Sequence, residues 1–192
     1  MFFASRPSRQ TVERFLSSSQ KLPLSYRPVG IANNGTLRDD LDEEVFVIGR
    51  GVADFERARG ALGAWKQFEL GWVELFPVSV PPVAGTDVAV LIRHFGFWSL
   101  NGCRVVYGVG NRDRGGRFGF AHGTLTNHAE SGEELFEVVL DPASDEVLYR
   151  IRAISRPRAL LARLGRPAVR ELQARFRRDS GTAMTRATRA DN

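Results

Sequence analysis

The feature that most constrains the fold is a change of hydrophobic period near Gly71. From there to Ser155, apolar residues alternate with polar ones, which is typical of strands that bury one face. Turn residues divide the region into six segments, 72–78, 87–95, 102–109, 117–125, 133–140 and 146–154. Six successive strands joined by turns predict an antiparallel meander.

The last predicted hairpin, on either side of the turn 141–146, fixes its own register. Pairing Leu140 with Val147 also sets three further pairs: Val138 with Tyr149, Phe136 with Ile151 and, on the opposite face, Glu137 with Arg150. One face is then apolar, and the other holds an ion pair. A shift by one residue would lose both, so we predict this register.

Helical periods flank the strands. Residues 8–18 predict a short helix with Ser8 as its N-cap. A second helix is predicted after Gly51, because apolar residues recur there at spacings of three and four: Phe55, Ala58, Leu62 and Trp65. The apolar run 45–48 between the two helices predicts one more strand.

After Pro157 the helical period returns. One face of this last helix is apolar, and it comprises Leu161, Leu164, Ala168, Leu172 and Phe176. Gly165 and Pro167 are expected to kink or break the helix. Residues 181–192 are poor in apolar side chains, so we expect them to fray.

This order of elements predicts an α+β fold, in which a curved antiparallel sheet of about seven strands wraps around a long C-terminal helix. It is the helix-grip order of START-like and birch-pollen-allergen-like proteins, which commonly leave a cavity between sheet and helix. We expect residues 1–180 to form a single domain, in which residues 1–44 supply a helix and an extended segment, and residues 181–192 to form a tail.

The charge distribution and the cysteine content limit the kinds of partner and the compartment that we expect for this chain. The net charge is +5, and residues 150–192 carry most of the excess, with twelve basic and three acidic side chains. Aromatic residues are sparse among these arginines, which argues against nucleic acid as a partner. Cys103 is the only cysteine, and no apolar run is long enough to span a membrane. We therefore expect a cytoplasmic protein.

Strings between Tyr26 and Met184 carry a family resemblance. They include YRPVG at 26–30, GRG at 49–51, GW at 71–72, RVVY at 104–107, GFAHGTL at 119–125, GEE at 132–134 and SRP at 155–157. Through them the chain resembles uncharacterised protein family 0548 of bacteria and plants. The resemblance implies a fold and leaves the reaction open. The family pattern has tyrosine at the position of His122. A mechanism that uses His122 would therefore not be one that the resemblance implies.

The candidate ligand-binding residues are those expected at the interface of sheet and last helix: Trp65, Trp98, Arg104, Tyr107, Phe120, His122, Glu134 and Tyr149. Glu134 shares a strand face with apolar residues. Glu133 points to the opposite face, so the two carboxylates cannot act as a close dyad. The spacing of the three histidines predicts no metal site, and no cofactor is indicated.

Three functions remain open from sequence. The pattern favours a non-enzymatic module that holds a small hydrophobic or amphipathic ligand between sheet and helix. The second is an enzyme that uses the same cavity, with Glu134 or His122 as acid or base. The third is an interaction protein that presents the basic C-terminal helix to an acidic partner. The sequence indicates neither an oligomeric state nor a particular ligand.

Overall fold

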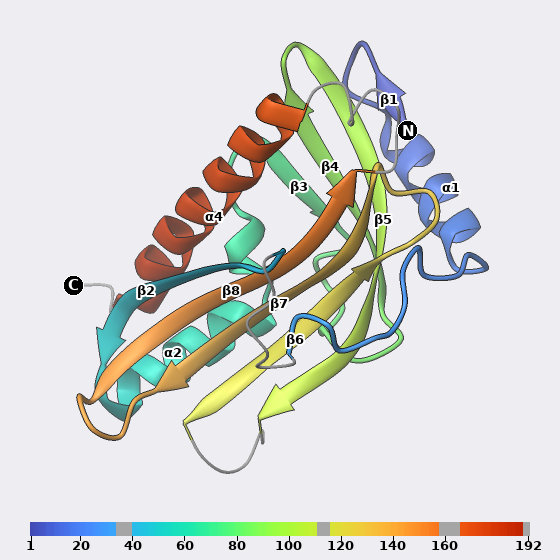
Figure 1. Cartoon of the computed structure of the whole chain (residues 1–192). Helices are drawn as coiled ribbons and strands as arrows, with labels where there is room; N and C mark the ends of the chain where they lie inside the picture. The colour runs from blue at the N-terminus through green and yellow to red at the C-terminus, as the bar shows by residue number, and fades with distance from the viewer. Residues whose placement is uncertain (34–39, 111–115, 158–165, 190–192) are drawn as a thin grey trace.

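A computed structural model describes residues 1–33, 40–110, 116–157 and 166–189. One antiparallel sheet dominates it, with its strands in the order β2-β8-β7-β6-β5-β4-β3 (Figure 1). The strands are β2 (Asp42–Arg50), β3 (Val73–Phe76), β4 (Asp87–His94), β5 (Phe97–Gly110), β6 (Arg117–Thr124), β7 (Glu130–Leu140) and β8 (Glu146–Pro157). The six strands predicted after Gly71 are confirmed, as is the strand before the second helix.

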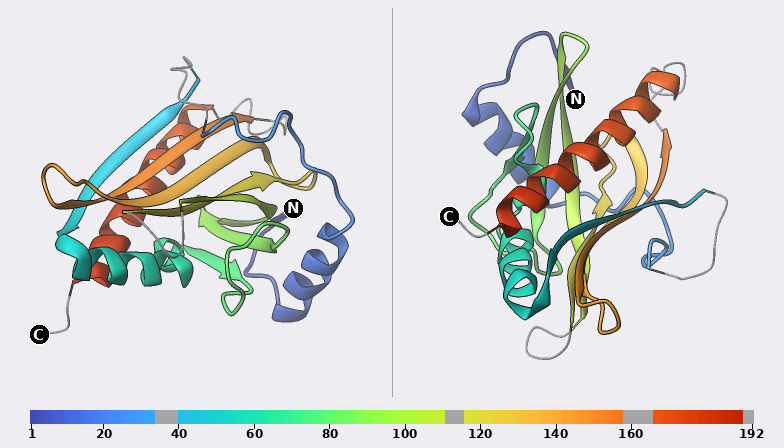
Figure 2. Two further views of the ribbon diagram at one scale, coloured as in Figure 1. Left: turned by 90° about the horizontal axis from the view of Figure 1, so that it is seen from below. Right: turned by 90° about the vertical axis from the view of Figure 1, so that its left-hand side faces the viewer.

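The helices are α1 (Arg9–Ser19), α2 (Gly51–Gly63), the short 3₁₀ helix η1 (Lys66–Phe68) and α4 (Arg166–Thr188). The sheet curls so that α4 and α2 lie on its concave side, whereas α1 lies outside, against β4 and β5 (Figure 2). This arrangement confirms the predicted helix-grip fold. None of the described helices is both long and apolar enough to cross a membrane.

Local sequence signals explain two element boundaries. The Ser8 hydroxyl accepts a hydrogen bond from the backbone N–H of Thr11 at 3.2 Å, which confirms the predicted N-cap of α1. A short strand that the sequence did not predict, β1 (Phe2–Phe3), pairs with the start of β5. A two-residue strand is too short to show an alternating pattern, which is why period alone misses it.

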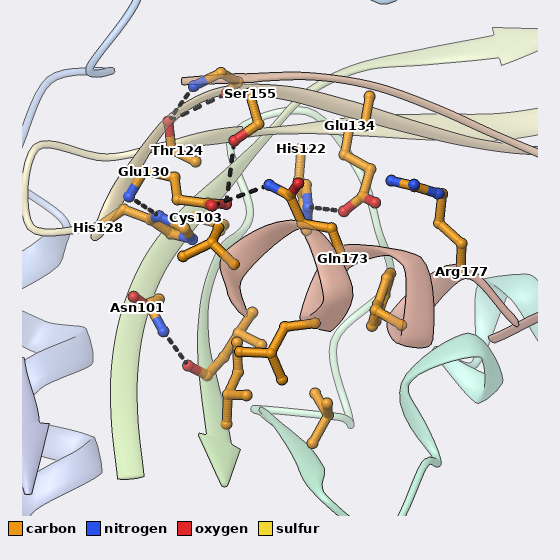
Figure 3. A pocket seen from close by; sticks show the side chains of 18 of the residues that line it. Asn101, Cys103, His122, Thr124, His128, Glu130, Glu134, Ser155, Gln173 and Arg177 are labelled. Carbon is orange, nitrogen blue, oxygen red and sulfur yellow. Dashed lines mark hydrogen bonds and ion pairs between the residues drawn. The ribbon is translucent and has the colours of Figure 1, made fainter. Parts of the chain in front are cut away.

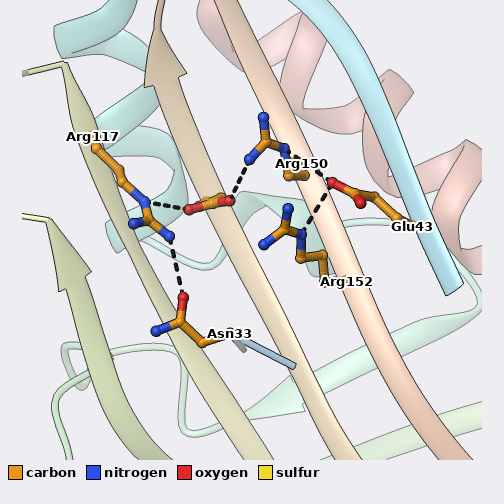
Figure 4. Close-up of polar contacts among 6 residues, drawn as sticks. Asn33, Glu43, Arg117, Arg150 and Arg152 are labelled. Carbon is orange, nitrogen blue, oxygen red and sulfur yellow. Dashed lines mark hydrogen bonds and ion pairs between the residues drawn. The ribbon is translucent and has the colours of Figure 1, made fainter. Parts of the chain in front are cut away.

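The predicted β7–β8 register is confirmed at every pair. Leu140 lies opposite Val147, and Phe136 lies opposite Ile151. On the convex face, a guanidinium nitrogen of Arg150 donates to the buried carboxylate of Glu137 at 3.1 Å. Figure 4 shows this cross-strand network, in which Arg117 approaches the same carboxylate from β6. The two guanidinium groups thus offset the free-energy cost of burying one carboxylate.

The C-terminal segment differs from our expectation. Helix α4 continues to Thr188, and Met184 is completely buried, so residues 181–188 are not a frayed tail. Their small side chains allow close packing instead: a Cβ at Gly181 would come within 2.6 Å of the Phe46 ring. Arg57 of α2 donates to the carbonyl of Thr188 at 2.8 Å and so caps the helix end.

In the described part of α4, which begins at Arg166, Pro167 is at the second position, where its missing N–H costs nothing. The kink or break expected at Gly165 and Pro167 stays a prediction, because the preceding residues lie outside the described part of the chain. Of the predicted apolar face, Leu172 and Phe176 pack against the main core. Leu161, Leu164 and Gly165 lie outside the described residues.

The convex face of the sheet is covered in part by the chain before β2. There Glu133 of β7, 2% exposed, accepts four hydrogen bonds and meets no basic side chain among the described residues. Its donors are the hydroxyls of Tyr26 and Tyr107, both at 2.6 Å, and the backbone N–H groups of Gly30 at 2.9 Å and Ala32 at 3.0 Å. Burial, followed by the neighbouring carboxylate, raises the pKa of both phenols and keeps them protonated as donors.

We predict that Glu133→Gln lowers the unfolding free energy by about 2–4 kcal/mol, because an amide NH₂ would face two donors that now reach a carboxylate oxygen. Urea denaturation followed by circular dichroism measures the loss. Glu13→Gln removes an exposed carboxylate of α1 and is expected to cost less than about 0.5 kcal/mol. Equal losses in the two variants would contradict this account of Glu133.

Candidate functional site

A cavity of about 200 Å³ lies between the concave face of the sheet and α4 (Figure 3). Strands β4 to β8 supply one wall, and the first half of α4 supplies the other. Most of the surface is apolar, and its hydrophobic members are Phe68, Trp72, Val73, Val90, Ile92, Cys103, Ala153, Ile154, Val169, Leu172 and Phe176. The alternation of the strands explains most of this lining, because every second residue of a strand points inward. Ile154 is an exception, since it is the cross-strand partner of the outward-facing Glu133.

Glu130, the first residue of β7, places a carboxyl group in this wall. The Ser155 hydroxyl of β8 donates to one carboxylate oxygen at 3.1 Å, and the Gln173 amide of α4 donates to the other at 2.9 Å. Gln173 therefore joins α4 to the sheet across the cavity. Burial raises the pKa of Glu130, the two hydrogen bonds lower it, and the nearby Glu134 raises it further, for a net increase.

A second polar group consists of His122 of β6 and Glu134 of β7. His122 Nε2 lies 3.2 Å from a Glu134 carboxylate oxygen, and the two residues are direct cross-strand partners. His122 Nδ1 is buried and has no hydrogen-bond partner among the described residues. The imidazole ring packs near Phe68 and Phe136, with centroid distances of 6.0 Å and 5.3 Å. A polar atom is thus left unsatisfied in apolar surroundings.

The other two histidines also line the cavity, so the fold brings together residues 34 positions apart in sequence. His94 Nε2 lies 3.0 Å from the Ser99 hydroxyl, and burial lowers the pKa of this imidazole. His128 Nδ1 accepts a hydrogen bond from the backbone N–H of Glu130 at 2.9 Å. Within the described parts of the chain, no group of three or more His, Cys, Asp or Glu residues is arranged to hold a metal ion.

Arg177 is the only lysine or arginine among the described residues that line the cavity. Its guanidinium lies 3.0 Å from a Glu44 carboxylate oxygen and 3.5 Å from one of Asp42. Both acids belong to β2, at the sheet edge next to α4. The positive charge of Arg177 is therefore already balanced by acids at the cavity edge.

The structure brings two of the eight predicted ligand-binding residues, His122 and Glu134, to the cavity. Three others are core residues outside its lining, Trp65, Phe120 and Tyr149. The hydroxyl of Tyr149, for example, lies 2.8 Å from that of Ser180. These rings fill the part of the interface between sheet and helices that is solidly packed.

The remaining three predicted residues lie on the other side of the sheet. Trp98 packs near α1 in a separate apolar cluster. Arg104 forms an ion pair with Asp87 at 2.5 Å. Tyr107 binds Glu133, because the register shift between Val105 and Tyr107 turns the following residues of β5 to the convex face.

Sequence reasoning missed Glu130 and Gln173. Glu130 was detectable, since it is four residues before Glu134 on the same strand and therefore shares its face. The signal was lost because the predicted strand began at residue 133. Gln173 lies next to the apolar position Leu172 on α4, and no pattern in the sequence ties it to β7.

We predict that Glu130→Gln stabilises the protein by about 0.5–2 kcal/mol at pH 8. The raised pKa means that the ionised carboxylate disfavours the folded state. In glutamine the amide oxygen can accept from Gln173 while the amide NH₂ donates to the Ser155 hydroxyl, so both contacts are kept without the charge. The gain is complete above the raised pKa and disappears as the pH falls towards the ordinary value of a glutamate, where the wild-type group is protonated in both states.

Thermal unfolding at pH 8 and pH 4 measures whether the substitution stabilises the protein only at the higher pH. Glu171→Gln removes an exposed carboxylate of α4, with a side chain 72% exposed, and is expected to leave the difference between the two pH values almost unchanged. A Glu130→Gln variant that is less stable than wild type at pH 8 would show that the charge itself stabilises the fold.

Comparisons with known proteins agree with the fold and the family resemblance. A UPF0548 protein of Dictyostelium discoideum is 32% identical over 206 residues, which cover 97% of this chain and 95% of the relative. A hypothetical protein of Helicobacter pylori has a similar structure, with a TM-score of 0.51 and 10% identity over 85% of this chain and 95% of that one. Protein CV1439 of Chromobacterium violaceum gives a TM-score of 0.50 and 14% identity, over 80% of this chain and 100% of that one.

At these identities, a likeness between structures shows the fold alone. The family rests on the sequence matches instead. The model of a domain of unknown function, DUF1990, matches residues 25–183 of this chain, which includes every strand from β2 to β8 and most of α4. Together with the amoebal relative, this match shows that the chain belongs to the UPF0548 family.

Proposed function

We propose that this protein binds a small hydrophobic or amphipathic molecule in the cavity between the sheet and α4, and that it does so without a chemical step. The observation that carries the proposal is an apolar space of about 200 Å³ at this interface. The space is partly open to solvent, and small-molecule sites are usually concave, mostly apolar clefts or cavities with a few polar groups.

The size of the cavity limits the ligand. A dry apolar cavity of about 150 Å³ is large enough to hold benzene. The space beneath α4 therefore suits a single ring with a short chain, on the order of ten non-hydrogen atoms. Its apolar wall with a few inward-pointing polar groups is the usual composition of a small-molecule site.

Acid–base catalysis in the same cavity is the second candidate, and one observation favours it. Glu134 faces the cavity and lies within hydrogen-bonding distance of His122, the geometry of an oriented general base. Cys103 is the only cysteine among the described residues that line the cavity. Cys103 is completely buried, and its pKa is raised by burial and by the carboxylates of Glu134 and Glu130, so its thiol stays protonated.

The basic face of α4 gives less support to a role in binding acidic partners. Arg175 and Arg178 lie within 3.4 Å and 3.0 Å of Asp179 and Glu171 on the same helix. The guanidinium of Arg175 also lies 4.4 Å from the centre of the Trp72 ring. Much of the positive charge of this helix face is therefore paired with acidic side chains of the same domain.

A cavity-filling variant tests the binding proposal. Leu172→Trp places a large ring into the cavity from α4, and we expect it to abolish binding of 3-phenyl-1-propanol, which has ten non-hydrogen atoms. Isothermal titration calorimetry measures the affinity of the wild-type protein and of the variant. Native mass spectrometry of protein purified from its own host then tests for a co-purifying small molecule in the wild type alone.

Thr182→Trp is the matched control, since it adds the same ring to an exposed position of the same helix, outside the lining of the cavity. We expect this variant to bind as the wild type does. The proposal fails if the wild type binds no probe of this size, or if Leu172→Trp binds it as well as Thr182→Trp.

A further inference from the structure

We propose that the ligand carries a hydrogen-bond donor as its polar head, preferably a primary ammonium group, which is received by Glu130, Glu134 and His122. The class of molecule is thus a small aryl or short-chain alkyl amine rather than a carboxylic acid. This inference rests on the binding function proposed above and specifies the chemistry of its ligand.

The first argument is the sign of the charge in the cavity. Glu130 and Glu134 both face it, and neither forms an ion pair with a lysine or arginine among the described residues. Arg177, the cation nearest to them in the lining, is paired with Glu44 and Asp42. In surroundings of low dielectric, two carboxylates without a cation attract a positive head group and repel a negative one.

The second argument is the unused acceptor capacity of Glu130. An ionised carboxylate accepts about four hydrogen bonds. Glu130 receives one from Ser155 and one from Gln173, both uncharged donors. An ammonium group, which has three N–H donors, would supply both the missing bonds and the missing charge. Charge-assisted bonds of this kind are about twice as strong as neutral ones.

The third argument concerns His122 and applies to its neutral imidazole. A carboxylate only accepts hydrogen bonds, so the contact with Glu134 places a proton on Nε2. In the neutral ring, Nδ1 is then an acceptor, and it is buried without a partner among the described residues. A ligand N–H or O–H would satisfy it. Both polar groups therefore require the same thing, a donor.

No side chain of β7 lies between the two acids on the inward face of the strand. Glu130, Gly132 and Glu134 follow one another on the same face of β7, and all three line the cavity. Gly132 contributes no side chain, and a Cβ there would come within 1.8 Å of the Ile154 carbonyl oxygen on β8. The close approach of the two strands thus keeps this position free of a side chain that would separate the two acids.

Four probes with the same ring and the same three-carbon arm test the head group: 3-phenylpropylamine, 3-phenyl-1-propanol, propylbenzene and 3-phenylpropanoate. At pH 8 the amine is an ammonium and the acid is a carboxylate. Calorimetric titration of the full chain should rank the amine first, the alcohol second and propylbenzene third. We expect the carboxylate to bind at least about tenfold more weakly than the amine.

Two variants assign the preference to residues. Glu130→Gln is expected to weaken binding of the amine about tenfold while it changes the affinity for the alcohol little, because the neutral amide keeps an acceptor but loses the charge. Glu134→Gln should likewise lower the preference for the amine over the alcohol. Glu171→Gln removes one exposed carboxylate from α4, and it controls for the change in net charge.

The outcomes separate the two proposals. If the carboxylate binds as tightly as the amine, and Leu172→Trp abolishes both, the binding function stands and the inference about the head group is wrong. If none of the four probes binds in a way that depends on Leu172, the binding function itself is wrong. A preference for the amine that persists in both Glu130→Gln and Glu134→Gln would also overturn the inference.

Discussion

The β7–β8 ladder is the constraint on which the rest of the structure depends. Its register assigns each residue of β7 to one face of the sheet, because side chains alternate along a strand. Glu134 therefore points into the cavity and Glu133 points out, where it holds the chain that crosses the convex face. Two adjacent glutamates thus lie in different environments, one in the wall of the cavity and one as a structural acceptor.

Much of this could be predicted from sequence, since it follows from local patterns. The alternation after Gly71 predicts the strands, and the pairing of Glu137 with Arg150 fixes one register. The candidate site was harder to predict, because it depends on which side of the sheet each ring faces. Tyr107 illustrates this: one irregularity in the pairing of β5 and β6 turns it away from the cavity. The tail was misjudged because close packing of small residues, as at Gly181, leaves no apolar signal.

The cavity has features that stability alone does not explain. A largely buried carboxyl group with a raised pKa and an imidazole nitrogen without a partner among the described residues both disfavour the folded state, and they line an apolar cavity. They occur together beneath one helix, whereas the neighbouring core around Trp65 and Phe120 is closely packed, with ring centroids 4.8 Å apart. Such local conflicts are typical of functional sites.

Helix α4 is held along the whole of its described length. Its second half is fixed by the close contact of Gly181 with Phe46, by the buried Met184 and by the cap that Arg57 provides. Its first half, over the cavity, is joined to β7 by the hydrogen bond of Gln173 and to β2 by the ion pairs of Arg177. The same stretch of helix therefore forms one wall of the cavity and sets the distance of that wall from the sheet.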